Sequence, residues 1–197
     1  MKEIVVATQN KGKIAEIRLA LAKLPLTVLS LSDFGCIPEA IEDGTSFKEN
    51  ALLKAKHYAK FTGKACLADD SGLEVDALQG APGIYSARFA GETANDDDNN
   101  RKLIAALEDV STQQRTARFC CVLAFVDTDG NTMTADGVCE GRIGEEMRGA
   151  GGFGYDCLFY VLELNKTMAE LSESEKNTIS HRGQALDRMA TKLGGYL

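Results

Sequence analysis

The hydrophobic and polar positions at the start of the chain alternate in blocks that predict a strand, a loop, a helix and a second strand. Residues 3–8 are an apolar run suited to a buried strand, and a polar break follows at residues 9–12. From Lys13 onward, apolar residues recur at helical spacing: Ile14, Ile17, Leu21 and Leu24. Pro25 ends this pattern, and residues 26–31 favour another strand. An acidic connection with turn residues covers 33–44.

A second, longer helix is predicted to begin after Ser46. Ser46 stands three residues before Glu49, which is the spacing of a capping box, and Gly63 is placed to end the helix. One face of this helix is apolar: Phe47, Ala51, Ala55, Tyr58 and Ala59. The opposite face carries lysines that we expect to lie in solvent: Lys48, Lys54 and Lys60.

The middle of the chain alternates between strand and helix patterns. Residues 65–69 and 73–78 favour strands on either side of a turn at 69–72. A helix is predicted over 96–108, entered through Asn95 and three aspartates that suit a helix N-terminus. Residues 116–128 and 131–140 flank Asp129-Gly130, a strong hairpin signal.

The last quarter predicts a glycine-rich loop, a strand and a final helix. Glycines crowd residues 149–154, and 155–161 has a strand pattern. Ser172 and Glu175 form a second capping box. The final helix carries an apolar stripe: Ala185, Leu186, Met189 and Leu193. The whole chain is therefore an α/β mixture without a linker long enough to separate two independent domains.

Composition narrows the classes of function. The 197 residues suit one domain, or one domain with a lobe, and 22 Lys plus Arg against 29 Asp plus Glu give a formal net charge of −7. That balance argues against a surface that binds a nucleic-acid polymer through its phosphates. The longest apolar runs are too short for a membrane span. The six cysteines lack a C-x-x-C spacing, which favours free thiols and a cytoplasmic location.

The loop after the first strand is a candidate phosphate-binding site. It consists of Thr8, Gln9, Asn10, Lys11, Gly12 and Lys13. A loop at a helix N-terminus presents free backbone N–H groups at the positive end of the helix dipole, and two lysines add charge. The segment lacks the leading glycine and the Ser or Thr of a Walker A loop. The alternative is an ordinary helix start with two solvated lysines.

Two successive aspartates, Asp69 and Asp70, follow the apolar run 65–68. Buried carboxylates are costly without partners, and Mg²⁺ prefers one or two carboxylates plus phosphate oxygens. Because successive side chains diverge, we expect one aspartate in the site and the other in a structural role. The alternative is an Asx turn with Gly72 in a left-handed conformation. Glu42 is the candidate for a second metal-facing acid, although a solvated acidic loop is the alternative.

The glycine-rich segment 149–156 contains G-x-G-x-x-G, but a strand pattern follows it where a dinucleotide-binding fold needs a helix. We therefore reject that interpretation. A flexible loop that carries Phe153 beside a planar ligand, with Asp156 at a polar edge, fits better. A hairpin loop with a packed aromatic side chain is the alternative.

Lys176, His181 and Arg182 fall within the predicted final helix. Lys176 and His181 are about 140° apart on one straight helix, so they cannot face a single small atom. Either they contact an extended ligand such as a nucleoside triphosphate, or the helix is interrupted near His181. The alternative is that these are surface side chains. Together the four clusters supply cations for phosphates, carboxylates for a metal and an aromatic loop for a base.

Six motifs occur in order: TQNKGK (8–13), SFKENA (46–51), ADDSGL (68–73), GAPGIYSAR (80–88), GFGYD (152–156) and SHR (180–182). In these motifs, and from end to end, the chain resembles the inosine/xanthosine triphosphate pyrophosphatase family. The resemblance implies Mg²⁺-dependent hydrolysis of ITP, dITP and XTP to the monophosphate and pyrophosphate. It also implies a single two-lobed α/β domain over residues 1–197, with a mixed sheet, flanking helices and a central cleft, and a homodimer.

The resemblance also implies roles for individual residues. Asp70 becomes the catalytic base and a metal ligand, with Glu42 as the second acid. Ser71 contacts the substrate, and residues 8–13 hold the phosphates together with Lys176. The base is enclosed by Phe153, Gly154, Tyr155, Asp156, His181 and Arg182.

Two positions depart from the family pattern. Gln9 stands where glycine is common, and Cys157 replaces the proline that usually follows Tyr-Asp. Because proline would restrict the backbone here, we expect a looser base loop. Two other classes of function remain open, a nucleotide-binding regulator without turnover and a metal-dependent phosphatase that removes phosphates singly.

Overall fold

The computed structural model describes residues 2–196. Its strands are β1 (Lys2–Val6), β2 (Leu26–Ser30), β3 (Ala65–Val75), β4 (Thr116–Val126), β5 (Thr132–Ile143), β6 (Phe159–Val161) and β7 (Lys166–Thr167). Its helices are α1 (Lys11–Leu21), α2 (Phe47–Thr62), α3 (Asp96–Ala106), α4 (Glu173–Ile179) and α5 (His181–Tyr196). No helix within this part of the chain has the length and hydropathy that a membrane span needs.

The strands form one mixed sheet of seven strands in the order β2-β1-β3-β4-β5-β6-β7. β1 lies parallel to β2 and β3, whereas β6 lies antiparallel to β5 and β7. The predicted fold class, an α/β fold with a mixed sheet and flanking helices, is confirmed. The strand–loop–helix–strand opening and the hairpin at Asp129-Gly130 are also found, with Gly130 at φ 85°.

The chain divides into two compact units. Unit 1 takes the chain up to Asp70, Cys121–Gly137 and the segment from Arg182 onward, and unit 2 takes Ser71–Cys120 and Val138–His181. Strands β3, β4 and β5 each contribute residues to both units. The single two-lobed domain with a central cleft stays a prediction.

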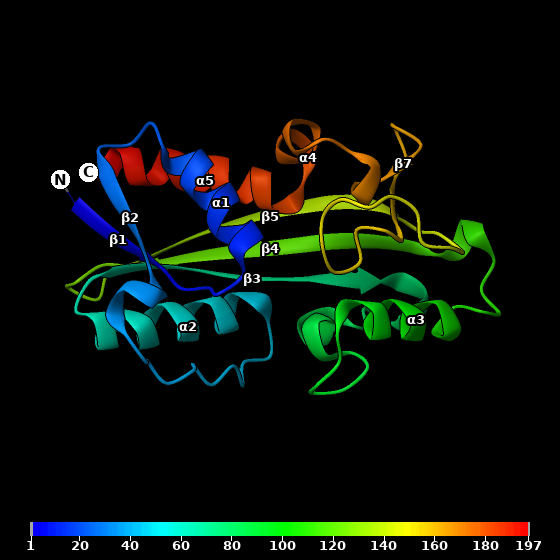
Figure 1. The fold of residues 1–197 in the computed structure, drawn as a ribbon, viewed down its shortest axis with the longest axis horizontal. Coiled ribbons are helices and arrows are strands. Elements are labelled where there is room, and N and C mark those ends of the chain that lie inside the picture. Colours follow the sequence, from blue (N-terminus) through cyan, green and yellow to red (C-terminus); the bar gives the residue numbers. More distant parts are fainter. Residues whose placement is uncertain (1, 197) are drawn as a thin grey trace. The chain divides into compact units, whose positions relative to one another are not determined.

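Helices cover both faces of the sheet in unit 1 (Figure 1). On one face, α1 and α5 bury an apolar cluster with β1 and β4, which includes the predicted stripe of α5: Ala185, Leu186, Met189 and Leu193. On the other face, α2 buries Ala51, Ala55 and Tyr58 against the strands. The amphipathic patterns therefore predicted which helix faces pack on the sheet.

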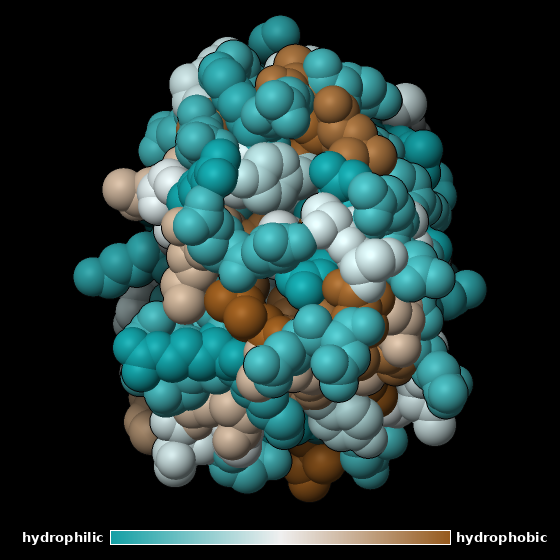
Figure 2. Space-filling model, turned by 90° about the vertical axis from the view of Figure 1, so that its right-hand side faces the viewer, coloured by the Kyte–Doolittle hydropathy of each residue, from teal (hydrophilic) through white to brown (hydrophobic). Residues whose placement is uncertain are grey.

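Unit 2 has a core of its own. Leu103 and Leu107 at the end of α3 share a buried cluster with Phe119, Phe159 and other apolar residues. The face of the molecule drawn in Figure 2 is mostly hydrophilic, with small separate hydrophobic patches. Each unit thus has an apolar interior that can hold polar groups in fixed positions.

The predicted turn at residues 69–72 was wrong. β3 runs from Ala65 to Val75 without a break, and Gly72 is not among the glycines with positive φ. Asp and Gly are common in turns, but here sheet pairing continues because Lys13 and Arg182 neutralise the Asp69 carboxylate inside the strand. The two carboxylates therefore lie inside a strand, where they are held more rigidly than in a turn.

All six cysteines are free thiols, and Cys36 is the exposed one. Burial raises the pKa of Cys66 to about 12 and of Cys139 to about 11, and it also raises the pKa of Cys157. Because the thiolate is the reactive form, we expect one thiol per folded chain to react rapidly with Ellman's reagent at pH 8. Cys36→Ser should remove this fast phase, while rapid reaction of several thiols in the native protein would contradict the burial.

Candidate functional site

The loop between β1 and α1 has the geometry of an anion-binding helix N-terminus. The Asn10 side chain caps α1 by accepting a hydrogen bond from the Lys13 backbone N–H at 3.1 Å, and the Thr8 hydroxyl accepts one from the Asn10 N–H. Lys11 and Gly12 are exposed in the first turn. Their backbone N–H groups belong to the set that has no partner within a helix. The loop thus leaves backbone N–H groups open at a helix N-terminus, and its contact with phosphate stays a prediction.

Gln9 fits this loop without backbone strain. Among the described residues, the non-glycine positions with positive φ are Gln79 and Asn165, so Gln9 needs no glycine-like conformation. Thr8, Gln9 and Lys11 border a pocket of about 320 Å³ whose other walls include Ser30 and Ser32. The departure from the family pattern at position 9 therefore places a polar side chain at a pocket rather than distorting the backbone.

Asp69 has the structural role that was expected of one of the two aspartates. Its side chain is completely buried, and it accepts hydrogen bonds from Arg182 Nε at 3.1 Å, from Lys13 Nζ and from Cys121 Sγ at 3.2 Å. Arg182 in turn binds Glu16 at 2.9 Å. Asp69 therefore ties β3 to the first turn of α1 and to α5, all within unit 1.

Asp70 is the aspartate left for chemistry. It is 9% exposed, and among residues 2–196 its Oδ2 atom is buried without a hydrogen-bond partner. Burial, together with the nearby carboxylates of Glu42 and Asp69, raises its pKa to about 7 against the opposing effect of Lys54. A buried carboxylate with an open oxygen and a pKa near neutrality is suited to a cation or to proton transfer.

Lys54 is a residue of this site that the sequence analysis missed. It was predicted to lie in solvent, but its side chain is 14% exposed, with Nζ 2.9 Å from Glu42 and 3.6 Å from Asp70. Nζ also donates to the Asp69 carbonyl oxygen at 3.2 Å. Burial opposes its charge, but Asp70 and Glu42 outweigh this effect and raise its pKa.

The correction for Lys54 has a clear physical reason. One helix carries the lysine, but its partners come from the acidic connection and from β3. A helical pattern shows which face is polar, not which distant segments cover it. No signal within residues 47–62 could have distinguished Lys54 from its solvated neighbours.

The residues in unit 1 fit a divalent cation. Within residues 2–196, no group of three or more His, Cys, Asp or Glu side chains is placed to form an all-protein metal site. Mg²⁺ usually needs only one or two carboxylates, because waters and substrate phosphates complete its coordination. The unpaired Asp70 oxygen, with Glu42 beyond Lys54, offers that donor set.

In unit 2, the loop with Phe153 is closed by the Asp156 carboxylate. Its Oδ2 accepts a hydrogen bond from the Phe153 N–H at 3.0 Å and pairs with Lys176 Nζ at 2.6 Å. The Lys176 ammonium also lies 4.7 Å from the centre of the Phe153 ring. Gly152 has φ 74°, and a Cβ there would lie 2.0 Å from the Asp156 carboxylate, so only glycine fits.

Tyr155 anchors the same loop to the interior of unit 2. It is buried, and its hydroxyl donates to the Ser86 carbonyl oxygen at 2.8 Å. Burial, with a contribution from Asp96, raises its pKa, so the hydroxyl stays protonated. Ser86 itself accepts from the Leu73 N–H and donates to the Gly83 carbonyl oxygen. Motif 80–88 therefore supports the loop.

The predicted final helix is in fact two helices. α4 ends at Ile179, Ser180 is extended with φ −67° and ψ 153°, and α5 begins at His181. The helix is therefore interrupted near His181, which was one of the two possibilities. His181 stacks on the Phe119 ring at 4.8 Å in unit 2. Arg182, the next residue, is buried in unit 1 on Asp69 and Glu16.

The predicted site residues fall into two groups. Unit 1 contains Thr8, Gln9, Asn10, Lys11, Gly12, Lys13, Glu42, Asp70 and Arg182. Unit 2 contains Ser71, Phe153, Gly154, Tyr155, Asp156, Lys176 and His181. Lys176, expected with the phosphate loop, contacts the base loop of its own unit. In Arg182, Nε is bound to Asp69 and one terminal guanidinium nitrogen is bound to Glu16, so neither atom is open to the base. Their contacts with a substrate stay predictions.

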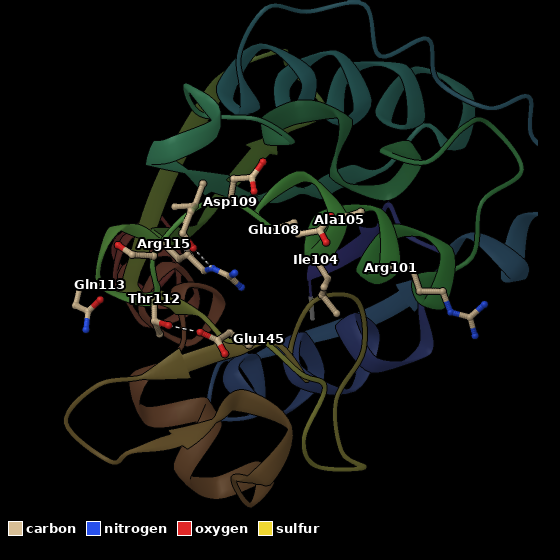
Figure 3. A pocket seen from close by; sticks show the side chains of 11 residues that line it. Arg101, Ile104, Ala105, Glu108, Asp109, Thr112, Gln113, Arg115 and Glu145 are labelled. Carbon is tan, nitrogen blue, oxygen red and sulfur yellow. Dashed lines mark hydrogen bonds between the residues drawn. The ribbon is translucent and has the colours of Figure 1, made fainter.

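Unit 2 also has a pocket of about 860 Å³, and the residues that line it are not those of the predicted site (Figure 3). It lies along α3 and the turns that follow, between Arg101 and Arg115, with Glu145 from beyond β5. The Arg115 guanidinium is occupied by the carbonyl oxygens of Leu107, Val110 and Gly144. Among residues 2–196, none of the predicted site residues lines this pocket.

A mixed α/β fold with a phosphate-type loop and a buried, partly unpaired carboxylate defines a protein suited to phosphate chemistry. The chain matches the Ham1 family over residues 4–192, and it belongs to that family. The family resemblance predicted from six motifs is thereby confirmed.

Individual relatives agree with this assignment. A dITP/XTP pyrophosphatase from Exiguobacterium sibiricum is 51% identical over 195 residues, covering 99% of this chain and 98% of the relative. One from Geobacter sulfurreducens is 53% identical over 194 residues, covering 98% of both chains. The solved structure of a HAM1 protein from Coxiella burnetii has a TM-score of 0.92 at 45% identity, covering 99% of this chain and all of that one.

Proposed function

We propose that the chain is a nucleoside triphosphate pyrophosphatase that hydrolyses ITP, dITP and XTP to the monophosphate and pyrophosphate and so removes them from the nucleotide pool. Membership of the Ham1 family and relatives named dITP/XTP pyrophosphatase support this proposal. The structural observation that carries it is the buried Asp70 carboxylate, with an unpaired oxygen, close to the lysines of unit 1.

We assign the phosphoanhydride chemistry to unit 1. Hydrolysis needs neutralisation of phosphate charge, an oriented water and an acceptor for its proton. Lys11 and the backbone N–H groups of α1 bind phosphate oxygens, together with Lys13, whose ammonium group has donors left beside its pair with Asp69. Asp70 orients the water and accepts its proton. A pKa near 7 suits that role, because such a carboxylate is ionised in about half of the molecules at neutral pH yet remains an effective base.

We propose Mg²⁺ as the cofactor, held by Asp70 and Glu42. When bound, the ion supplies positive charge to the triphosphate and to the attacking oxygen. Lys54 keeps the two carboxylates together and offsets their repulsion. The homodimer and the cytoplasmic location are proposals of the same kind, supported by the family resemblance and by the free thiols.

We assign base recognition to unit 2. The Phe153 ring offers a stacking face, and the loop backbone, Asp156 and His181 offer polar groups to a 6-oxo purine. A site that donates a hydrogen bond to the 6-oxo group leaves its donor unpaired against the 6-amino group of adenine, which is a large penalty. This mechanism accounts for selection against ATP.

A nucleotide panel with product analysis tests the proposal. ITP, dITP, XTP, ATP and GTP are incubated with the protein and Mg²⁺, and the products are separated by ion-exchange chromatography. We expect IMP, dIMP and XMP with pyrophosphate, and a kcat/KM for ATP at least about 100-fold lower, because ATP carries the 6-amino group. IDP with orthophosphate as first products would instead identify a stepwise phosphatase. Binding without turnover would identify a nucleotide-binding regulator.

A further inference from the structure

Two side chains in the first two turns of α3 hold Gly154 in the base loop (residues 152–156), one through its N–H and one through its carbonyl oxygen. The Gly154 N–H donates to Asp96 Oδ2 at 2.6 Å, and the Gly154 carbonyl oxygen accepts from Asn100 Nδ2 at 2.9 Å. Asp96 and Asn100 are four residues apart on α3, so they lie on the same face of the helix. Both contacts lie within unit 2.

Asp96 is used differently from the other acids in the first turn of α3. Asp97 pairs with Arg101 at 2.6 Å on the surface, and Asp98 completes a capping box with Asn95. These two contacts serve the helix itself. The Asp96 carboxylate instead binds a backbone N–H that lies 58 residues further along the chain. A charged acceptor makes this hydrogen bond stronger than an ordinary neutral one.

Asn100 binds the loop through its side-chain amide nitrogen but leaves the amide oxygen buried without a partner among the described residues. Its side chain is 3% exposed, and among residues 2–196 its Oδ1 atom is buried without a hydrogen-bond partner. The Gly154 carbonyl oxygen fixes the orientation of the amide, because the reverse orientation would bring two oxygens together. An amide that leaves one buried atom unpaired is a poor choice for packing alone, so its contact with Gly154 needs another explanation.

The backbone of the loop around Gly154 has few restraints of its own. Gly152 and Gly154 both have positive φ, at 74° and 62°, and a Cβ at Gly154 would meet open space. Cys157 leaves free a backbone torsion that the proline of the family pattern would fix. Fixing such a segment costs backbone conformational entropy, which the two hydrogen bonds at Gly154 offset.

We propose that Asp96 and Asn100 are positioning residues for base discrimination. By fixing Gly154, they set where the neighbouring Phe153 ring and the Asp156 carboxylate stand, and hence how well a 6-oxo purine is distinguished from a 6-amino purine. The inference rests on the proposed function, which it deepens. It assigns no contact between α3 and the nucleotide.

The test compares four variants: Asp96→Ala, Asp96→Asn, Asn100→Ala and, as a matched control, Asp97→Ala. Asp96 and Asp97 are both exposed and occupy the same helix turn, so their replacement changes charge and helix dipole alike. Asp96→Asn removes the charge but keeps an acceptor for the Gly154 N–H. The readouts are kcat and KM for ITP and ATP, dissociation constants for IMP and AMP, and inhibition by pyrophosphate.

We expect Asp96→Ala and Asn100→Ala to lower the ITP-to-ATP ratio of kcat/KM about tenfold, mainly through a higher KM for ITP. The IMP-to-AMP affinity ratio should fall by a similar factor. Inhibition by pyrophosphate, which has no base, should stay unchanged. Asp96→Asn should recover the ratio to within about threefold of the unmodified chain, and Asp97→Ala should leave it unaltered.

An unchanged ratio in a folded Asp96→Ala variant would overturn the inference, and so would an equal loss in Asp97→Ala. A parallel loss of pyrophosphate inhibition would reveal a general structural effect instead. If Asn100→Ala does not fold, the exposed Asp96 series still decides the question. If the unmodified chain hydrolyses no ITP, the proposed function fails separately, while the IMP and AMP affinities continue to test the role of α3.

Discussion

Asp70→Asn is expected to abolish hydrolysis of ITP while leaving the chain folded. The substitution keeps the shape of the side chain but removes the proton acceptor and the charge at the oxygen that lacks a partner in the described structure. We expect kcat/KM to fall by about 10³-fold or more, because the proposed base and the proposed cation ligand are removed together. Steady-state kinetics with ITP and Mg²⁺ measure the effect.

The same variant is expected to be more stable than the unmodified chain at pH 8. The pKa of Asp70 is raised to about 7 in the folded state, well above that of an aspartate in an unfolded chain, so folding takes up a proton at pH values between the two. The stability contributed by the protonated carboxyl is therefore present at acid pH and lost as the pH rises through 7. Asparagine does not ionise, so the variant does not lose this stability at high pH. In metal-free buffer at pH 8 its free energy of unfolding should be about 1–2 kcal/mol higher than that of the unmodified chain, a Tm increase of about 2–8 °C.

Asp43→Asn is the matched control for Asp70→Asn. Asp43 is an exposed aspartate next to Glu42, so the chemical change is the same at a solvated position. It should alter neither turnover nor the pH dependence of Tm. Activity of Asp70→Asn within about tenfold of the unmodified chain would remove Asp70 from the role of base. A Tm difference that does not grow with pH would contradict the raised pKa.

Arg182→Met is expected to be the most destabilising of the substitutions considered. Arg182 is 2% exposed and binds Asp69 and Glu16, whose side chains are 0% and 16% exposed. Removing the guanidinium takes away the counter-charge bound to Glu16 and leaves the buried Asp69 with Lys13 alone of its two cations. The cost should be about 3–5 kcal/mol in the free energy of unfolding, measured by urea denaturation.

Arg188→Met provides the comparison on the same helix. Arg188 pairs with Asp136 at 3.3 Å, but both side chains are more than half exposed, so its loss should cost at most about 1 kcal/mol. The double variant Asp69→Asn/Arg182→Met should be less destabilised than the sum of its single variants, because the uncompensated charge is removed. A cost below about 1 kcal/mol for Arg182→Met would show that the buried network is not needed for folding.

Local signals predicted much of the fold. The caps at Asn95 and Ser172 begin α3 and α4 as expected, and Gly63 ends α2 in the left-handed conformation. Ser46 also caps α2, but the Glu49 carboxylate binds Thr45 rather than returning to Ser46. Such signals depend on a few neighbouring residues, so the sequence contains nearly all the information needed.

The sequence predictions were wrong where contacts with distant segments of the chain determine the local structure. Asp69 to Gly72 has the composition of a turn, yet β3 continues through it because Lys13 and Arg182 neutralise Asp69 from two helices. Lys54 was wrongly predicted to lie in solvent because its partners, Glu42 and Asp70, also come from other segments of the chain. The ordered motifs predicted the family correctly, whereas the pairing of Asp69 with Arg182 is visible only once the chain is folded.

Lys54 has a consequence for how the proposed metal site forms. Its ammonium group lies 2.9 Å from Glu42 and 3.6 Å from Asp70, so the chain carries its own monovalent counter-ion among the acids. Folding can therefore bring these carboxylates together before any divalent ion arrives. The binding of such an ion becomes an adjustment of an existing charge balance, rather than the event that creates the site.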